Sequence, residues 1–134
     1  MSQITAAEYE KRLVALCLGG ARGFPKKERD RHVMLMAASH TFERGMIYTE
    51  KEVDAAVRDW LDRGCPSLQI DQVTIRRELI DASYLTRDDA GRFYGVGPGP
   101  AVISYAEDVA AVDPIRTIER AIEDRASRKS RRDP

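Results

Sequence analysis

The sequence predicts a mainly α-helical chain with a small β-hairpin, arranged as a winged helix-turn-helix with extra N- and C-terminal helices. Two helical patterns follow one another closely between residues 49 and 82, and the second contains the adjacent arginines Arg76 and Arg77. Two short strand patterns then flank a tight turn at Asp88–Gly91, where glycine supplies the positive φ that such a turn needs. Helix, turn, helix and hairpin in this order are typical of winged helix-turn-helix proteins.

Residues 1–23 are predicted to hold an N-terminal helix. Thr5 and Glu8 are spaced as a capping box, in which each side chain accepts a hydrogen bond from the other residue's backbone N–H. Apolar side chains then recur at helical spacing, at Tyr9, Leu13, Leu16 and Cys17. The pair Gly19-Gly20 ends the pattern.

Residues 24–96 form the predicted winged-helix domain. Its first helix is expected from about residue 27 to residue 42. A second helix begins at the capping box of Thr49 and Glu52 and ends at Gly64, since proline at position 66 forbids its continuation. Asp71–Ala82 is the expected recognition helix, and Tyr84–Val96 is the expected wing, with strands at residues 84–87 and 92–96.

Residues 97–134 are predicted to contain a Gly/Pro break, a C-terminal helix and a basic tail. The break is the sequence Gly97–Pro100, and the next twelve residues show no clear period. Asp113 before Pro114 is a typical helix start. The following isoleucine stripe must be covered, and we favour a homodimer contact through this helix over packing on its own chain; the stripe comprises Ile115, Ile118 and Ile122. Residues 127–134 are expected to be frayed.

Length and charge favour one small domain without a strong electrostatic character. The chain has 134 residues and a net charge of zero. Residues 25–96 carry 12 Lys/Arg and 13 Asp/Glu, whereas Arg125–Arg132 carries five basic residues and no acidic one. A dedicated DNA-binding domain usually has a clear basic footprint, so the neutral core argues against strong DNA binding. A charged, solubilising tail is the competing interpretation of the basic run.

The sequence carries no pattern for a membrane span, a signal peptide or an assembled catalytic site. No apolar run approaches the roughly 18 residues of a spanning helix, so we expect a cytoplasmic protein with no membrane contact. Cys17 and Cys65 are far apart in sequence and are interpreted as two partly buried thiols, with neither zinc nor a disulfide. His32 and His40 belong to no metal-binding motif. We therefore expect no enzymatic activity, no metal and no cofactor.

The motifs of the central segment resemble a bacterial family catalogued as domain of unknown function 2087. The resemblance covers roughly residues 24–96 and rests on Phe24-Pro25, Lys26–Arg31, Tyr48–Val53, Ile75–Asp81, Leu85, Arg87, Gly91 and Tyr94. It implies a winged-helix fold and a transcriptional or nucleic-acid role, but no established activity. Unlike many members, this chain has no second recognisable DNA-binding domain.

Arg76 and Arg77 are expected to have different roles, because successive helical residues point about 100° apart. Arg76 falls within the apolar arc of the helix formed by Ile75, Leu79, Ile80 and Val73. A buried guanidinium needs an anionic partner. We therefore predict a structural ion pair of Arg76 with Glu50 and Glu52.

The candidate residues for contact with double-stranded DNA lie on the recognition helix, the wing and the tail. They are Gln72, Thr74, Arg77, Arg87, Arg92, Arg128, Lys129, Arg131 and Arg132. DNA binding predicts that Thr74, Arg77, Arg92 and the tail form one positive surface. The alternative is a protein-interaction module, which predicts an exposed apolar patch on residues 115–122 or 101–112. A solvated helix face and a solvated wing, with Asp88 and Asp89 at its tip, are the simpler interpretations of these arginines.

Overall fold

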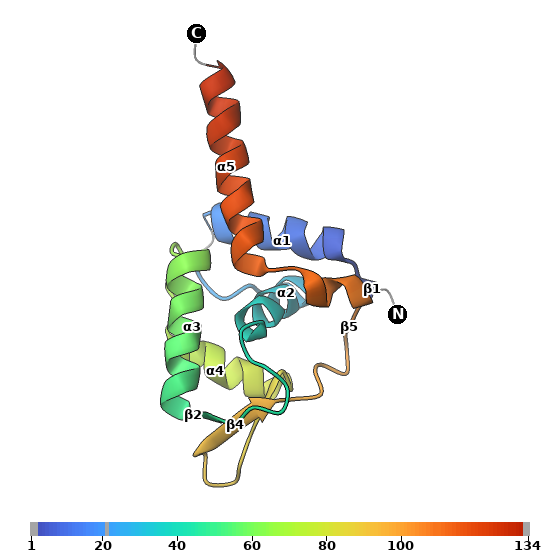
Figure 1. Cartoon of the computed structure of the whole chain (residues 1–134), viewed down its shortest axis with the longest axis vertical. Helices are drawn as coiled ribbons and strands as arrows, with labels where there is room; N and C mark the ends of the chain where they lie inside the picture. Colours follow the sequence, from blue (N-terminus) through green and yellow to red (C-terminus); the bar gives the residue numbers. More distant parts are fainter. Residues whose placement is uncertain (1–2, 21, 133–134) are drawn as a thin grey trace.

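The computed structural model describes residues 3–20 and 22–132 (Figure 1). Within them the chain is mainly helical, as predicted. Five α-helices are present, and their bounds are α1 (Ala6–Leu18), α2 (Glu28–Ser39), α3 (Glu50–Gly64), α4 (Gln72–Asp81) and α5 (Pro114–Arg132). The capping box predicted for α3 is present, since the Thr49 Oγ1 accepts a hydrogen bond from the Glu52 N–H at 3.2 Å and the Glu52 carboxylate accepts one from the Thr49 N–H.

A small antiparallel sheet accompanies the helices and contains the predicted hairpin. Its strands are β2 (Tyr48–Thr49), β3 (Leu85–Arg87) and β4 (Phe93–Val96), in the order β2-β4-β3. The strand β2, which precedes α3, was not expected from the sequence. Two further strands, β1 (Gln3–Ile4) and β5 (Ser104–Tyr105), pair in parallel, and a 3-10 helix at Glu107–Ala111 follows them.

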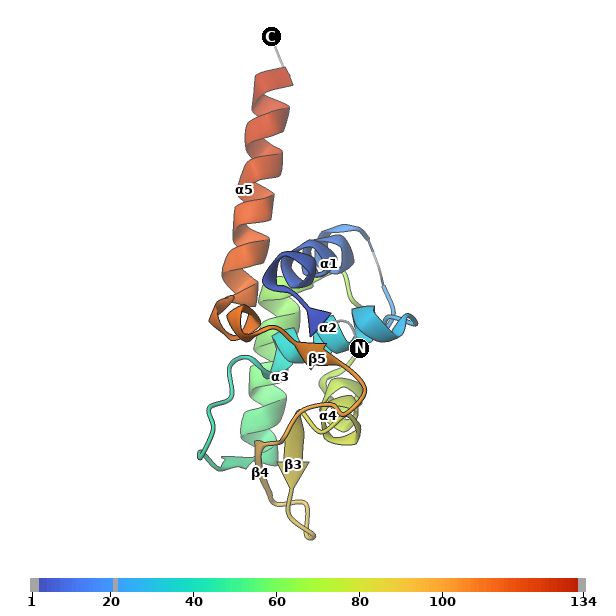
Figure 2. The same cartoon turned by 90° about the vertical axis from the view of Figure 1, so that its right-hand side faces the viewer.

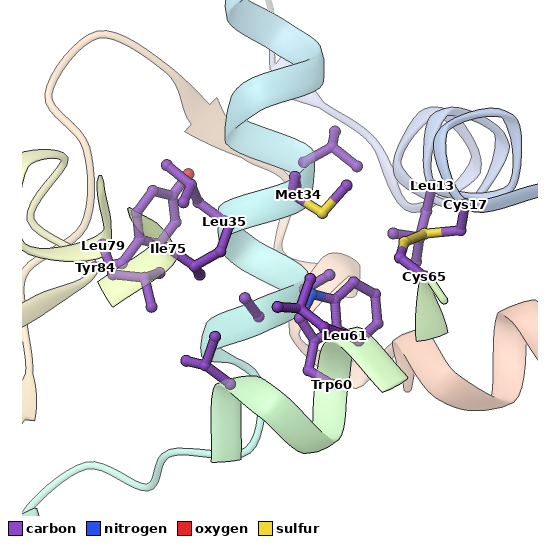
Figure 3. Close-up of a cluster of buried hydrophobic side chains, with 14 of the residues drawn as sticks. Leu13, Cys17, Met34, Leu35, Trp60, Leu61, Cys65, Ile75, Leu79 and Tyr84 are labelled. Carbon is purple, nitrogen blue, oxygen red and sulfur yellow. A yellow bond between two sulfur atoms is a disulfide. The ribbon is translucent and has the colours of Figure 1, made fainter. Parts of the chain in front are cut away.

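Helix α2 lies in the middle of the molecule, between α1 and α5 on one side and α4 and the sheet on the other (Figure 1, Figure 2). Four consecutive residues, 32–35, are buried, and they cover every side of the helix. A helix that is buried on every side must sit in the core. The other helices contribute the rest of the core, which includes Leu13, Trp60, Leu61, Ile75 and Leu79 (Figure 3).

A hydrogen-bonded cluster joins α2 to two distant segments of the chain. The Tyr84 hydroxyl lies 2.9 Å from the His32 Nδ1 and 2.6 Å from the Tyr105 hydroxyl. The Tyr105 hydroxyl donates to the His32 carbonyl oxygen at 2.8 Å. Because all three side chains are buried or half-buried, these bonds offset the cost of removing their polar atoms from water. They attach β5 and the segment between α4 and β3 to the central helix.

Helix α5 packs on the chain with its first half and projects from the body with its second half (Figure 1, Figure 2). Ile118 is buried against the same chain, and Ile115 is half-buried, whereas the Ile122 side chain remains 50% exposed. Residues 127–132 were expected to be frayed, and this was wrong, because they continue α5; residues 133–134 lie outside the described part. None of the described helices is both long and apolar enough to cross a membrane.

Cys17 and Cys65 form a disulfide, which corrects the expectation of two separate thiols. Their Cα atoms are 4.6 Å apart although 48 positions separate them in sequence. The bond joins the last turn of α1 to the residue that follows α3 (Figure 3). The sequence did not indicate this pairing, because the two cysteines meet only when α1 packs beside the end of α3.

We expect reduction of the Cys17–Cys65 bond to lower the free energy of unfolding by about 2–4 kcal/mol, since the bond restricts a long loop in the unfolded chain. Urea unfolding followed by circular dichroism, with and without dithiothreitol, measures the difference. The double variant Cys17→Ala/Cys65→Ala serves as the control, and its stability should not respond to dithiothreitol. Equal stability of the oxidised and reduced protein would contradict the expectation.

Candidate nucleic-acid interface

Helix α4 is fixed at its start by a side-chain cap and along its length by two buried residues. The Asp71 Oδ1 accepts a hydrogen bond from the Thr74 N–H at 2.8 Å, which satisfies one of the free N–H groups of the first turn. Ile75 and Leu79 are fully buried against the core. The opposite face of α4 is therefore turned outward, and it exposes Thr74 and Arg77.

Arg76 forms an ion pair that joins α4 to α3. Its Nη1 lies 2.5 Å from the Asp54 Oδ1, and its Nη2 lies 3.6 Å from the Glu50 Oε1. The Arg76 side chain is only 13% exposed. The Tyr94 hydroxyl of β4 donates to the other oxygen of Glu50 at 3.2 Å. One cluster of polar side chains therefore holds α3, α4 and the sheet together.

The partners of Arg76 differ in part from those that we predicted. Glu50 contacts Arg76, as expected. The hydrogen bonds described for the Glu52 carboxylate are with Thr49 and not with Arg76. The nearer partner, Asp54, was missed. It lies one helical turn after Glu50, so both carboxylates share a face of α3. The four-residue spacing of Asp54 from Glu50 is the signal in the sequence that points to Asp54 as a second partner of Arg76.

Two opposing effects act on the Arg76 guanidinium. Desolvation lowers its pKa, but the hydrogen bond that it donates to Asp54 and the charges of Asp54 and Glu50 outweigh that effect and raise the pKa above its ordinary value. Asp54 and Glu50 thus neutralise the positive charge of Arg76 within the protein. Arg77, the next residue, points away from this cluster and stays exposed.

A recess of about 380 Å³ lies between α4 and the hairpin. The residues that line it are Arg76, Arg77, Ile80, Asp81, Arg87 and Tyr94. Arg87 of β3 is paired with Tyr94 of β4, so the sheet register turns Arg87 to the same side as Tyr94. The fold therefore brings Arg77 and Arg87, two exposed arginines from different elements, to one recess.

The remaining candidates on the helix and the wing lie outside this recess. Gln72 is half-buried and Thr74 exposed in the first turn of α4. Arg92 is exposed at the hairpin turn, where the Asp88 Oδ1 accepts hydrogen bonds from the Arg92 N–H at 2.7 Å and the Phe93 N–H at 3.1 Å. The hydrogen bond from the Phe93 N–H, and to a smaller extent that from the Arg92 N–H, lowers the pKa of Asp88. Its carboxylate therefore stays charged beside Arg92.

The basic tail lies at the opposite end of the molecule from the hairpin (Figure 1). Arg128 and Lys129 are exposed on the projecting half of α5. Arg131 and Arg132 belong to its last turn, and their side chains lie outside the described part of the structure. The expectation that Thr74, Arg77, Arg92 and the tail form one positive surface is therefore wrong. It failed because α5 leads away from the domain, a direction that the sequence does not encode locally.

The exposed apolar side chains also differ from those expected. In the segments predicted to form a patch, Ile103, Val109 and Ile118 are buried, although Val102 and Ile122 are exposed. Three exposed apolar residues that the sequence did not single out lie in or just before the sheet: Met46, Ile47 and Phe93, with exposures of 51%, 71% and 49%. Phe93 pairs with Thr49, and Ile47 lies two residues before Thr49. The alternating pattern thus places Ile47 and Phe93 on the outer face of the sheet.

The two histidines lie in different environments, and neither belongs to a metal-binding cluster in the described residues. His32 is buried beside Tyr84, and desolvation lowers its pKa. His40 is exposed just after α2. Within the part of the chain that the structure describes, no group of three His, Cys, Asp or Glu residues is placed to hold a metal ion.

One protein family matches this chain, over residues 22–96, and it is described as an uncharacterized protein conserved in bacteria (DUF2087). The match covers more than half of the chain. The chain belongs to this family. Its DUF2087 segment contains α2, α3, α4, the three-stranded sheet and the whole recess, whereas α1 and α5 lie outside it. No curated protein and no solved structure matches the chain.

We expect Arg76→Ala to lower the free energy of unfolding by about 2–3 kcal/mol, because it removes charge-assisted hydrogen bonds from a mostly buried site. This value is below that of a fully buried pair, since Asp54 and Glu50 are partly solvated. Arg77→Ala is the matched control and should change stability by less than about 0.5 kcal/mol. Urea unfolding of both variants measures the contrast, and equal losses would contradict the assignment of Arg76.

Proposed function

We propose that this protein is a cytoplasmic bacterial winged-helix protein that binds double-stranded DNA and regulates transcription. In this proposal α4 is the recognition helix and the β3–β4 hairpin is the wing. The order of elements supports the proposal, since α2, β2, α3, α4, β3 and β4 follow one another and the sheet order is β2-β4-β3. A helix-turn-helix places its second helix in the major groove, where base edges are read.

The observation that carries the proposal is the meeting of Arg77 and Arg87 at the recess beside α4. Arginine binds phosphate in a bidentate manner and also matches the acceptors of guanine in the major groove. Arg76 contributes little to this surface, because Asp54 and Glu50 neutralise it. Asp81 also lines the recess and reduces its positive charge. Binding through so few free cations is expected to be weak and sensitive to salt.

The basic end of α5 is proposed as a separate, sequence-independent contact with phosphate. The projecting half of α5, which carries Arg128 and Lys129, and the hairpin lie at opposite ends of the molecule (Figure 2). Long DNA that bends or a second duplex is needed to reach both ends. A short duplex bound at the recess should therefore leave the end of α5 without a DNA contact.

We expect the double variant Arg77→Ala/Arg87→Ala to bind a short duplex more weakly and with a lower salt dependence. The slope of log K against log salt should fall by about 0.9 for each phosphate contact that is lost. Fluorescence anisotropy with a labelled duplex at several salt concentrations measures both quantities.

The variant Arg128→Ala/Lys129→Ala is the matched control, because it removes the same net charge from the opposite end of the molecule. It should bind the short duplex nearly as well as the wild type. An equal loss in both double variants would show that binding depends on total charge and not on the recess. Absence of duplex binding by the wild type at about 50 mM salt would contradict the proposal.

A protein-interaction module is the second candidate function. It is favoured by the exposed apolar residues Ile47 and Phe93 on the outer face of the sheet, since exposed apolar surface marks protein contact sites. The two candidate functions are sensitive to different substitutions. If the recess binds DNA, Phe93→Ser should leave DNA binding intact. If the outer face of the sheet binds a protein, Arg77→Ala/Arg87→Ala should leave that protein contact intact.

Self-association through α5 stays a prediction, and it now rests on Ile122, since Ile118 is covered by its own chain. We expect Ile122→Glu to shift the protein toward the monomer in sedimentation velocity experiments. Val102→Glu is the control, because it changes an apolar residue of similar exposure outside α5. A wild type that is monomeric at every concentration would contradict this prediction.

A further inference from the structure

The three-stranded sheet lies at the end of the molecule opposite to the end of α5, and its outer face is the one opposite to the buried Tyr94 (Figure 1). β4 is the central strand, and the alternation of its side chains places Phe93 and Gly95 on the outer face. In the strand register, Thr86 of β3 lies beside Gly95. Ile47, the residue before β2, lies on the other side of Gly95, because the register of β2 with β4 continues by one residue. Gly95 is therefore at the centre of the outer face.

Gly95 leaves a hollow in the middle of this face. A glycine is commonly required by a positive φ or by crowding, and neither applies here. Gly95 is not among the glycines with positive φ in the described part of the chain. A Cβ at this position would lie 3.6 Å from the Met46 carbonyl oxygen and 3.9 Å from the Thr86 Oγ1, which are ordinary contact distances. Glycine inside a strand weakens the strand and often marks a place where another molecule approaches closely.

Phe93 is a large exposed side chain next to this hollow. It is 49% exposed, and Ile47 is 71% exposed. Phe93 and Gly95 are two residues apart on one strand, which is a separation of about 7 Å. A projecting ring and a hollow on the same face make that face complementary to a second copy of itself. In a two-fold contact each copy supplies a ring to the hollow of the other copy, as an isologous interface requires.

The outer face carries no charge that would oppose such a contact. The residues that the register places on it, at positions 47, 49, 86, 93 and 95, are all uncharged. The nearby Asp88 carboxylate accepts hydrogen bonds from the N–H groups of Arg92 and Phe93, which hold it at the turn. The chain has a net charge of zero, so two copies do not repel one another at long range. A second copy is therefore a better match for this face than a highly charged partner such as nucleic acid.

We propose that the outer face of the sheet is a contact between two copies of this chain. The two sheets pack face to face about a two-fold axis that runs between them and crosses the strands at the level of Tyr94. Each Phe93 then enters the hollow at Gly95 of the other copy and lies beside Ile47 of that copy. Packed sheets lie about 10 Å apart, a gap that side chains such as a phenyl ring fill.

The proposed contact is weak and leaves the rest of the surface free. The sheet is small, so the contact falls below the standard interface area of about 1,200–2,000 Å², and we expect a dissociation constant of about 10–100 µM. Arg87 lies on the same side of the sheet as Tyr94, so the recess that it shares with Arg77 stays open in the dimer. The contact is separate from the one predicted at Ile122 of α5, and it does not depend on DNA binding.

Sedimentation velocity without DNA, from about 5 to 500 µM protein, measures the contact. It is carried out with the Ile122→Glu variant of the full chain, so that association through α5 does not mask the result. We expect this protein to pass from monomer to dimer over the range. Adding Gly95→Val, which fills the hollow, or Phe93→Ala, which removes the ring, should weaken the dimer at least about tenfold. Adding Val102→Ala, a change at an apolar residue of similar exposure outside the sheet, should leave the dimer intact.

Two further measurements separate loss of the contact from loss of the fold. Valine at position 95 points into open space and suits a strand, so Gly95→Val should not lower the midpoint of urea unfolding at low protein concentration. A mixture of the Gly95→Val and Phe93→Ala proteins should associate more tightly than either alone, because the ring of the first enters the hollow of the second and the filled hollow meets the shortened side chain. An Ile122→Glu protein that stays monomeric up to about 500 µM would overturn the proposal. Undiminished dimerisation of Gly95→Val, or a mixture no tighter than its components, would overturn it as well.

Discussion

The ion pair of Arg76 with Asp54 and Glu50 determines how α4 and the hairpin are arranged against α3. It lies where α3, α4 and β4 meet, and it neutralises a guanidinium that is largely removed from water. A charge in this position is tolerated only with close anionic partners. Once Arg76 faces α3, the helical repeat turns Arg77 outward. The recess beside the hairpin therefore depends on a residue that contributes almost no charge to it.

The central position of α2 imposes a second constraint, because every side of the helix must be covered. The DUF2087 segment supplies α3 and α4 for part of this surface. Helix α1 covers another part, and α5 in turn packs on α1 and α3. The Cys17–Cys65 bond and the hydroxyl of Tyr105 attach these outer segments to the core. Helices α1 and α5, which lie outside the DUF2087 segment, thus complete the core without lining the recess between α4 and the hairpin.

Local signals in the sequence were sufficient for most helix boundaries. Thr49 with Glu52 and Asp71 with Thr74 are caps formed by residues three positions apart, so they are legible in the sequence and present in the structure. The hairpin turn was identified by Gly91, which has φ of 69°. In contrast, the pairing of Cys17 with Cys65, the contact of β1 with β5 and the direction of α5 depend on residues far apart in the chain. No local pattern reports them.

The candidate site also combines features that local sequence patterns predict with features that depend on how distant elements pack. The separate roles of Arg76 and Arg77 followed from helical geometry, and the nearness of Arg87 to Arg77 follows from the register of the hairpin with Tyr94. The tail was misplaced because its charge pattern carries no information about where α5 points. Charge counted along a sequence is therefore a poor guide to a binding surface unless the elements that carry it are known to meet.

NMR chemical-shift mapping with a short duplex distinguishes DNA binding at α4 and the hairpin from binding elsewhere on the chain. If DNA meets α4 and the hairpin, the largest amide shifts fall within residues 72–81 and 85–96, and residues 125–132 shift little. Shifts confined to the end of α5, or no shifts at any part of the chain, would contradict it.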